Sequence, residues 1–322
     1  MATTSIATSH GLTVNQWTAQ LYAKYQEQTF FSKFKGTDEN SIVQVKRELQ
    51  KQPGDAITFG LAGTLSGSGV TGNTPLAYAS TGGDGSGVEE AMVFYNQKVS
   101  IDQIRNGVRI AGAMDEKRVA FNLRNQAKLQ LTDWMARNED AALFTALAGA
   151  SSVDISASVE ASGKVALDDI VLMKKEAMFP SGSTKKIRPI TLKDGEEVFV
   201  LGLNPTDAVG LKQSSDYKTI YANAGMRGDS NRLFTGALGF YNGVIIHEHS
   251  GFTAGTPVLM GAQALFLAYG NEIIYGEEMF DYGNQTGFMI GSIRGVELAV
   301  FNDGVSNAGS HGAIKFDITV GW

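Results

Sequence analysis

The chain has 322 residues, of which 43% are hydrophobic and 19% charged, a length and composition that allow a sizeable core and argue against wholesale disorder. It contains no cysteine, which excludes disulfides, thiolate metal sites and cysteine nucleophiles. Its net charge of −6, without a block of basic residues, disfavours tight binding to a nucleic-acid backbone.

The N-terminal segment is predicted to be an arm. Its first residues, MATTSIATSHGLT, lack the basic and apolar regions of a signal peptide. No apolar run of about 18 residues occurs anywhere, so the chain is expected to be soluble, made in the cytosol and without a transmembrane helix. Apolar residues four apart indicate a short amphipathic helix over residues 14–28: Trp17, Leu21 and Tyr25. Phe30, Phe31 and Phe34 follow, and the sequence leaves open whether they are buried in the chain's own core or on a partner.

Alternation of apolar and polar residues predicts strands on both sides of a glycine-rich stretch. Residues 42–51 alternate as a strand with one wet face would, and a second alternation begins at Ile57 after the turn signal Pro53-Gly54-Asp55. Residues 63–87 are rich in Gly, Ser and Thr, and alternation resumes over residues 93–101. We therefore expect a long two-stranded arm with a flexible tip. Such an arm needs a partner surface, because isolated hairpins are marginal in water.

A continuous helix is predicted over Asp115–Ala148, a stretch without Gly or Pro. At ~1.5 Å per residue it would be about 50 Å long. Apolar residues recur along it at three- and four-residue spacing: Val119, Leu123, Ala127, Leu131 and Trp134 or Met135. Gly149 is expected to end the helix. A helix of this length must pack against another long element, in the same subunit or in a neighbour.

The C-terminal half is predicted to contain more strand than helix. Leu167–Phe179 has a helical pattern, and Asn204 followed by Pro205 is a helix start with Asn204 as the N-cap. Short apolar runs predict strands, with one strand–helix pair left open among them: Val198–Leu203, Val244–His249, Val258–Leu267, 273–275, Phe288–Ile293, Val296–Phe301 and Ile314–Val320. The expected fold class is α+β, with two long projections attached to a mixed body.

Three sequence features could carry chemistry, and each has a simpler explanation. Gly67–Gly72 matches G-x-G-x-x-G, but no helix follows it, so a loop tip is favoured over a dinucleotide site. His247 and His249 would share a face of a strand, but a catalytic zinc site usually has three protein ligands, and a structural pair is favoured. Glu277, Glu278 and Asp281 could form salt bridges with arginines such as Arg227, Arg232 or Arg294, and the sequence does not support acid–base catalysis by them.

Several long stretches together resemble one known family. They are ELQKQPGDAITFGL, VSIDQIRNGVRIAGAMDEKRVAFNLRNQAKLQLTDWMARNED, RLFTGALGFYNGVIIHEHSGF, LMGAQAL, GEEMFDYGNQTGFMIGSIRGVELAVFN and GAIKFDITV. In this order and spacing they resemble the major capsid protein family of the N-four-like tailed phages. The resemblance covers nearly the whole chain, and its most specific parts are Phe234–His249 and Glu278–Gly295.

The resemblance implies the Hong Kong phage type of coat-protein fold, with an N-terminal arm, an extended two-stranded loop that lies across the next subunit, a long spine helix, and peripheral and axial domains. The division it implies is an N-terminal arm at 1–41, the extended loop at 42–101, a peripheral domain at 102–195 with the spine helix at 115–148, a mainly axial domain at 196–295 and peripheral C-terminal strands at 296–322.

The resemblance also implies a function: a major capsid protein, not an enzyme, that self-assembles as hexamers and pentamers into an icosahedral shell. The shell would enclose double-stranded DNA without sequence-specific binding, and no cofactor, metal or membrane is implied. The expected location is the virion capsid, after assembly in the host cytoplasm. Portal and decoration proteins are expected partners. Scaffolding, if used, is expected as a separate protein, because the arm begins almost at Met1.

Inter-subunit contacts are expected from two sets of residues. The extended-loop set is Val43, Val45, Phe59, Gly67, Gly69, Gly72, Val93 and Tyr95. The N-terminal-arm set is Trp17, Leu21, Tyr25, Phe30 and Phe31. Two alternative functions stay open: the shell protein of an encapsulin-like compartment, which would load a cargo enzyme instead of DNA, and a metal-dependent enzyme that uses His247 and His249.

Overall fold

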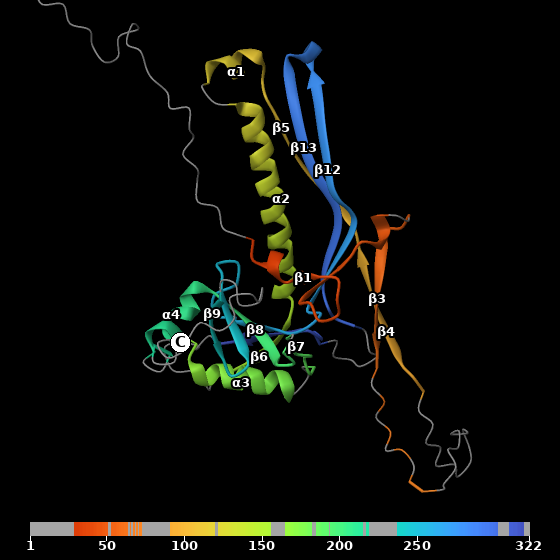
Figure 1. The fold of residues 1–322 in the computed structure, drawn as a ribbon, viewed down its shortest axis with the longest axis vertical. Helices are drawn as coiled ribbons and strands as arrows, with labels where there is room; N and C mark the ends of the chain where they lie inside the picture. The colour runs from red at the N-terminus through yellow and green to blue at the C-terminus, as the bar shows by residue number, and fades with distance from the viewer. Residues whose placement is uncertain are drawn as a thin grey trace, which may run out of the picture. The chain divides into compact units, whose positions relative to one another are not determined.

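The fold was obtained as a computed structural model, and Figure 1 shows its elements in chain order. The structure describes residues 29–50, 53–63, 65, 67, 69, 71–72, 91–119, 122–155, 165–181, 185–192, 194–214, 217–218, 237–301 and 309–318. The chain forms two compact units, which we describe separately. Unit 1 contains Gln103–Asn138 and Ile273–Ser292, and unit 2 contains Phe30–Asp102, Glu139–Glu272 and Ile293–Trp322.

Within these described ranges, the α-helices are α1 (Ala113–Arg118), α2 (Leu123–Ala148), α3 (Leu167–Met178) and α4 (Pro205–Gln213). Short 3-10 helices cover Phe31–Lys33, Glu48–Gln50 and Asp281–Gly283. The strands are β1 (Lys35–Gly36), β2 (Val43–Lys46), β3 (Ala56–Ala62), β4 (Phe94–Ser100), β5 (Asp102–Arg109), β6 (Ser151–Asp154), β7 (Ile190–Thr191), β8 (Glu197–Leu203), β9 (Ala237–Tyr241), β10 (Val244–Glu248), β11 (Val258–Met260), β12 (Leu265–Phe280), β13 (Gln285–Leu298) and β14 (Ala313–Asp317).

The strands form a five-stranded sheet, a seven-stranded sheet and a two-stranded ribbon. The five-stranded order is β1-β2-β12-β13-β5, and the seven-stranded order is β6-β14-β11-β8-β10-β9, with β7 beside β8. In the larger sheet, β8 runs parallel to β10 and antiparallel to β11. The hairpin of β9 and β10 turns at Asn242-Gly243, where both φ angles are positive (48° and 76°). This is the conformation that an Asn-Gly pair favours in two-residue hairpin turns.

In unit 1, the first part of α2 lies alongside β5 and β13 and covers one of their faces (Figure 1). Ala127, Leu131 and Met135, four residues apart on the helix, are buried against Phe288 and Ile290 of β13. Four-residue spacing places side chains on one helix face. The predicted apolar stripe is therefore confirmed from Leu123 onward as the face on which this helix packs, whereas Val119 lies before the helix begins.

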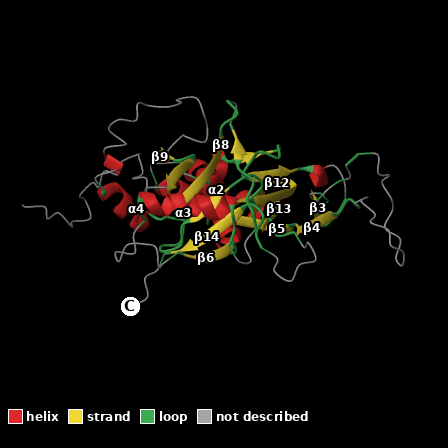
Figure 2. Cartoon of the chain, turned by 90° about the horizontal axis from the view of Figure 1, so that it is seen from below, coloured by secondary structure: helices red, strands yellow, loops and turns green. Residues whose placement is uncertain are grey.

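In unit 2, the seven-stranded sheet is covered on both faces. Along β8, Val198 and Val200 share a core with the last part of α2, whereas Phe199, Leu201 and Leu203 share a core with α3 and α4. Figure 2 shows α3 and α4 beside the strands that they cover. Because both faces are buried, β8 is a continuous apolar run rather than an alternating one.

The predicted continuous helix is interrupted, and this prediction was wrong. α1 ends at Arg118, and Val119 has an extended backbone (φ −109°, ψ 146°). Asn122 then acts as the N-cap of α2: its side-chain oxygen accepts a hydrogen bond from the backbone N–H of Asn125 at 3.1 Å. α2 is 26 residues long, or ~39 Å at the usual rise, and it ends before Gly149 as predicted. No helix among the described residues is long and apolar enough to span a membrane.

The strand predicted over residues 42–51 was also wrong in extent and exposure. β2 covers only Val43–Lys46 and lies in the interior of the five-stranded sheet, and a 3-10 helix follows it. Gln44, expected on a wet face, is buried, and its amide oxygen accepts a hydrogen bond from Gln263 at 3.0 Å. An interior strand of a covered sheet buries both of its faces, which the alternation did not reveal.

Three other local predictions are confirmed, but the predicted strand boundaries near the C-terminus are not. α3 occupies the predicted helical stretch, and Asn204 caps α4 by accepting a hydrogen bond from the backbone N–H of Thr206 at 3.0 Å. The two-stranded arm is present as the antiparallel pair β3–β4. The runs predicted as separate strands at 273–275, 288–293 and 296–301 instead belong mostly to the two long strands β12 and β13.

Candidate functional site

The β3–β4 ribbon has a covered base. In its register, Ile57 lies opposite Val99, and Phe59 lies opposite Gln97. Ile57, Phe59 and Val99 are buried, and the Phe59 ring stacks on Phe266 of β12 with 4.0 Å between ring centres. At the base, Gln97 donates to the Leu298 carbonyl at 2.7 Å. The base of the ribbon is therefore part of the unit 2 core.

Beyond this base, the ribbon exposes apolar side chains on both faces. Leu61 and Tyr95 continue the inner face and are only partly buried. Phe94 belongs to the opposite face and is 68% exposed, and Met92, just before the strand, is 73% exposed. Exposed apolar residues that lie close together on a soluble chain are typical of an interaction surface. Phe94 and Met92 were not among the predicted contact residues.

A second candidate site is the segment Phe30–Lys35, which we call the strap. Phe30, Phe31 and Phe34 are buried in the unit 2 core. The Phe30 ring lies 5.8 Å from that of Phe144 on α2 and 5.2 Å from that of Phe252, measured between centres. The sequence left open whether these aromatics pack inside the subunit or on a partner. The structure places them inside.

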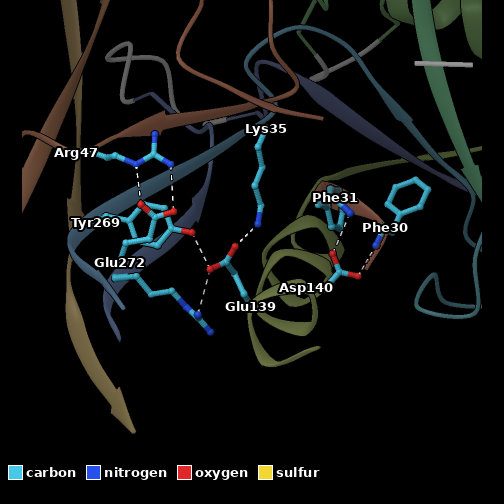
Figure 3. A network of polar contacts seen from close by, with 9 residues as sticks. Phe30, Phe31, Lys35, Arg47, Glu139, Asp140, Tyr269 and Glu272 are labelled. Carbon is cyan, nitrogen blue, oxygen red and sulfur yellow. Dashed lines mark hydrogen bonds and ion pairs between the residues drawn. The ribbon is translucent and has the colours of Figure 1, made fainter. Parts of the chain in front are cut away.

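Two consecutive acidic residues of α2 hold the strap, as Figure 3 shows. The buried carboxylate of Asp140 accepts hydrogen bonds from the backbone N–H groups of Phe30 (2.8 Å) and Phe31 (2.9 Å). The carboxylate of Glu139 forms an ion pair with the Lys35 ammonium at the other end of the strap. The strap is thus fixed to one helix at its first and last residues.

Glu139 is also the centre of a larger polar network. Its Oε2 accepts hydrogen bonds from the Tyr269 hydroxyl at 2.7 Å and from the buried Arg294 guanidinium at 3.2 Å. Burial alone would raise the pKa of the Glu139 carboxyl, but the Lys35 ammonium and these hydrogen bonds outweigh it and hold the pKa below its usual range. Burial, with the Glu139 charge beside it, raises the pKa of the Tyr269 phenol. Glu139 is therefore held ionised, with its charge satisfied from several elements.

His247 and His249 lie in the same aromatic surroundings as the strap. The Nδ1 of buried His247 is 3.2 Å from Nζ of Lys33, and burial lowers the pKa of that lysine. The His249 ring stacks on Phe144 at 5.1 Å, and its Nδ1 accepts a hydrogen bond from the Gly251 N–H at 3.0 Å. In the part of the chain that the structure describes, no group of three or more His, Asp or Glu is placed to hold a metal ion. The contacts of the two histidines with Lys33, Phe144 and Gly251 fit the structural role that the sequence favoured for them.

The predicted contact residues have different surroundings. Val43, Val45, Phe59, Phe30 and Phe31 have their side chains buried inside the chain's own cores. Val93 is exposed, and Tyr95 packs in part against the core at the ribbon base. Gly69 and Gly72 have positive φ angles (68° and 76°), as glycines allow. Trp17, Leu21 and Tyr25 lie outside the described residues. The inter-subunit role of all these positions, Gly67 included, stays a prediction.

Comparison with known proteins identifies the family. The sequence pattern of the family described as phage capsid protein matches residues 5–161 and 151–257, which together cover most of the chain. The chain belongs to the phage capsid protein family. As a phage capsid protein, it is a component of the virion and of a multi-subunit shell. Membership favours this function over the compartment and enzyme alternatives.

Individual relatives agree with the family. The chain is 26% identical to the major capsid protein of Pseudomonas phage KPP25 over 87% of each sequence. Its fold is similar to the capsid of Ralstonia phage GP4, with a TM-score of 0.76 and 24% identity over 100% of this chain and 99% of that one. The capsid of cyanophage Pam1 gives a TM-score of 0.76 and 23% identity over 99% of each chain. The predicted tailed-phage coat-protein fold is confirmed.

Proposed function

We propose that the chain is the major capsid protein of an N-four-like tailed phage, with the Hong Kong phage type of coat fold. In this proposal it self-assembles as hexamers and pentamers into an icosahedral shell around double-stranded DNA. Family membership and the similarity in fold along almost the whole length of solved phage capsid chains support the proposal. The proposed peripheral domain is 102–195 with 296–322, and the proposed axial domain is mainly 196–295.

The observation that carries the proposal is the ribbon, which is apolar on both faces beyond its covered base. Phe94 and Met92 together expose a large apolar surface in the separate subunit. Burying a side chain of this size stabilises by about 1.5–3 kcal/mol, so a neighbouring copy that covers both residues gains a substantial contact. The exposed ribbon is therefore proposed to lie on a second copy of the chain.

The net charge fits a shell that encloses DNA without gripping it. At −6, the subunit repels phosphate groups on average, so sequence-specific or tight DNA binding is not expected. Portal, decoration and separate scaffolding proteins are proposed as partners of the shell, and the host cytoplasm as its place of assembly.

Expression of the full-length chain tests the proposal. Negative-stain microscopy and analytical ultracentrifugation of the purified protein are expected to show closed shells or capsomers in equilibrium with subunits. A reconstruction of the particles is expected to place Phe94 and Met92 against a neighbouring copy. A protein that stays monomeric at all concentrations, or a shell in which both side chains face solvent, would contradict the proposal.

A further inference from the structure

The strap is the first part of the described chain after residues 1–28, so it is the point at which those residues connect to the rest of the chain. The resemblance to tailed-phage coat proteins implies a contact of those residues with a second copy, through Trp17, Leu21 and Tyr25. The strap's own aromatic residues, Phe30, Phe31 and Phe34, are buried inside the subunit. The strap therefore fixes the point at which the N-terminal segment is attached to the subunit.

The way in which the strap is held goes beyond what burial of its aromatics requires. Both oxygens of the Asp140 carboxylate are used by two consecutive backbone N–H groups, those of Phe30 and Phe31. Hydrogen bonds to a charged group are about twice as strong as neutral ones and fix the direction of the donors. Lys35 adds an ion pair to Glu139 at the other end. These contacts therefore fix the direction in which the strap runs, as well as its attachment to α2.

We infer that Glu139 and Asp140 form a clasp whose role is to position the N-terminal segment for contact with a second copy of the chain. This inference rests on the proposed function, because it requires assembly. The partner that the N-terminal segment contacts is proposed to be a second copy of the chain, because the family builds multi-subunit shells from copies of such a chain. Glu139 and Asp140 are positioning residues: they act through the strap.

The length of the tether gives the expected size of the effect. Tyr25 is five residues from Phe30 in the sequence, and five residues of fully extended chain span at most about 18 Å. If the strap were free, the next fixed element would be β2, beginning at Val43, eighteen residues from Tyr25. The effective concentration of a tethered group falls roughly as the −3/2 power of tether length, which gives about a sevenfold loss. Sevenfold is an upper value, because the buried phenylalanines still hold a strap that has lost its polar contacts.

The test measures the critical subunit concentration for particle formation, by light scattering of the full-length chain. Asp140→Asn, alone and combined with Glu139→Gln, is expected to raise it several-fold. Hydrogen–deuterium exchange should show faster exchange at the Phe30 and Phe31 amides of the unassembled variants, with β10 still protected. Asp207→Asn is the matched control: the buried Asp207 carboxylate also accepts a backbone N–H, that of Gly255 at 3.0 Å, in a different part of unit 2. It is expected to leave the critical concentration unchanged.

A double-mutant cycle separates positioning from general destabilisation. If the clasp acts through the N-terminal segment, Asp140→Asn should add little to the assembly defect of the Trp17→Ala, Leu21→Ala variant. Equal effects of Asp140→Asn in both backgrounds would overturn the inference, as would faster amide exchange without any change in assembly.

Two further outcomes are decisive. If the clasp variants do not fold, exchange in the unassembled wild-type subunit decides, and amides of Phe30 and Phe31 that exchange as fast as in a free peptide would overturn the inference. A wild-type chain that forms no particles would instead contradict the proposed function, so the two failures are distinguishable.

Discussion

The seven-stranded sheet and the β3–β4 ribbon both carry large apolar side chains, but they differ in how the subunit covers them. The sheet has α3 and α4 on one face and the last part of α2 on the other, so its central strand β8 is buried on both sides. The ribbon is covered on one face only, and only at its base by Phe266 and its neighbours. Its outer residues, such as Phe94, are exposed.

This difference shows which part of the fold is complete within one chain. The free energy of the sheet comes from contacts that form when a single subunit folds. The exposed part of the ribbon gains its contacts only when another surface arrives, so its folding is coupled to association. A change in the sheet should therefore lower subunit stability, whereas a change in the outer ribbon should leave stability intact and act on assembly.

A loss of stability of several kcal/mol is expected in the sheet. Leu201→Ala removes a fully buried side chain from the core shared with α3 and α4 and should lower the free energy of unfolding by about 2–5 kcal/mol. Urea unfolding of the unassembled subunit measures it. Val209→Ala on the exposed side of α4 is the control, with an expected change within about 0.5 kcal/mol. Equal losses for both variants would show that the sheet is not the stabilising core.

A smaller loss is expected where the ribbon meets the body. A Cβ at Gly295 of β13 would clash with the backbone carbonyl of Ser100 at the end of β4. Gly295→Ala should force the strands apart and cost about 1–3 kcal/mol. Gly60→Ala on β3 is the matched control, because a Cβ there meets no atom within 4 Å. Thermal unfolding of both variants compares a glycine that packing requires with one that it does not. A Gly295→Ala subunit as stable as wild type would show that close packing of Gly295 against Ser100 is not required.

Acid should weaken the complete part of the subunit through Glu139. The folded-state pKa of this carboxyl lies below its ordinary value of 4.5, so its contribution to stability is present above that pH and is lost as the pH falls through the folded-state value. Below pH 4.5, wild type should therefore lose more stability than Glu139→Gln, which cannot titrate at this position. Chemical unfolding at a series of pH values measures the two slopes. Parallel slopes would mean that the network does not depress this pKa.

Local signals in the sequence predicted the parts of the fold that local physics determines. The cap at Asn204, the helix α3 and the stripe on α2 depend on residues within one or two turns of each other, and all three are confirmed. The break before α2 was missed because its cap, Asn122, lies inside a stretch without Gly or Pro, where it reads as an ordinary helix residue. β2 was misjudged because burial on both faces depends on strands far away in the chain.

The candidate site was only partly predictable for the same reason. The aromatics Phe30 and Phe31 were recognised as residues that must be covered, but the sequence could not say by what. Asp140 bonds to residues about 110 positions away, and in the sequence it is one more charge on a charged helix. Phe94 was missed because it lies out of phase with the apolar face that runs through Tyr95 and Val99. Phe94 could have been recognised because it is an apolar residue on the strand face that otherwise carries polar residues such as Asn96 and Lys98.

The smallest effect on stability is expected at Phe94. This position tests most directly whether the exposed ribbon acts on assembly while the sheet acts on stability. Phe94→Ser removes an exposed apolar side chain, so the free energy of unfolding of the separate subunit should change by no more than about 0.5 kcal/mol. Assembly should suffer, because the covering of this side chain by a second copy is lost, and light scattering should show a critical concentration raised by about tenfold or more.

Two controls define what a result at Phe94 means. Asn96→Ser changes an exposed polar residue on the same ribbon face and should alter neither quantity. Phe59→Ala, in the buried base, should destabilise the subunit itself by about 3–5 kcal/mol. The same residue type would then act on stability at one end of the ribbon and on association at the other. If Phe94→Ser assembled like wild type, the exposed ribbon would have another purpose than contact between copies, and the sheet and the ribbon would no longer differ in the way proposed.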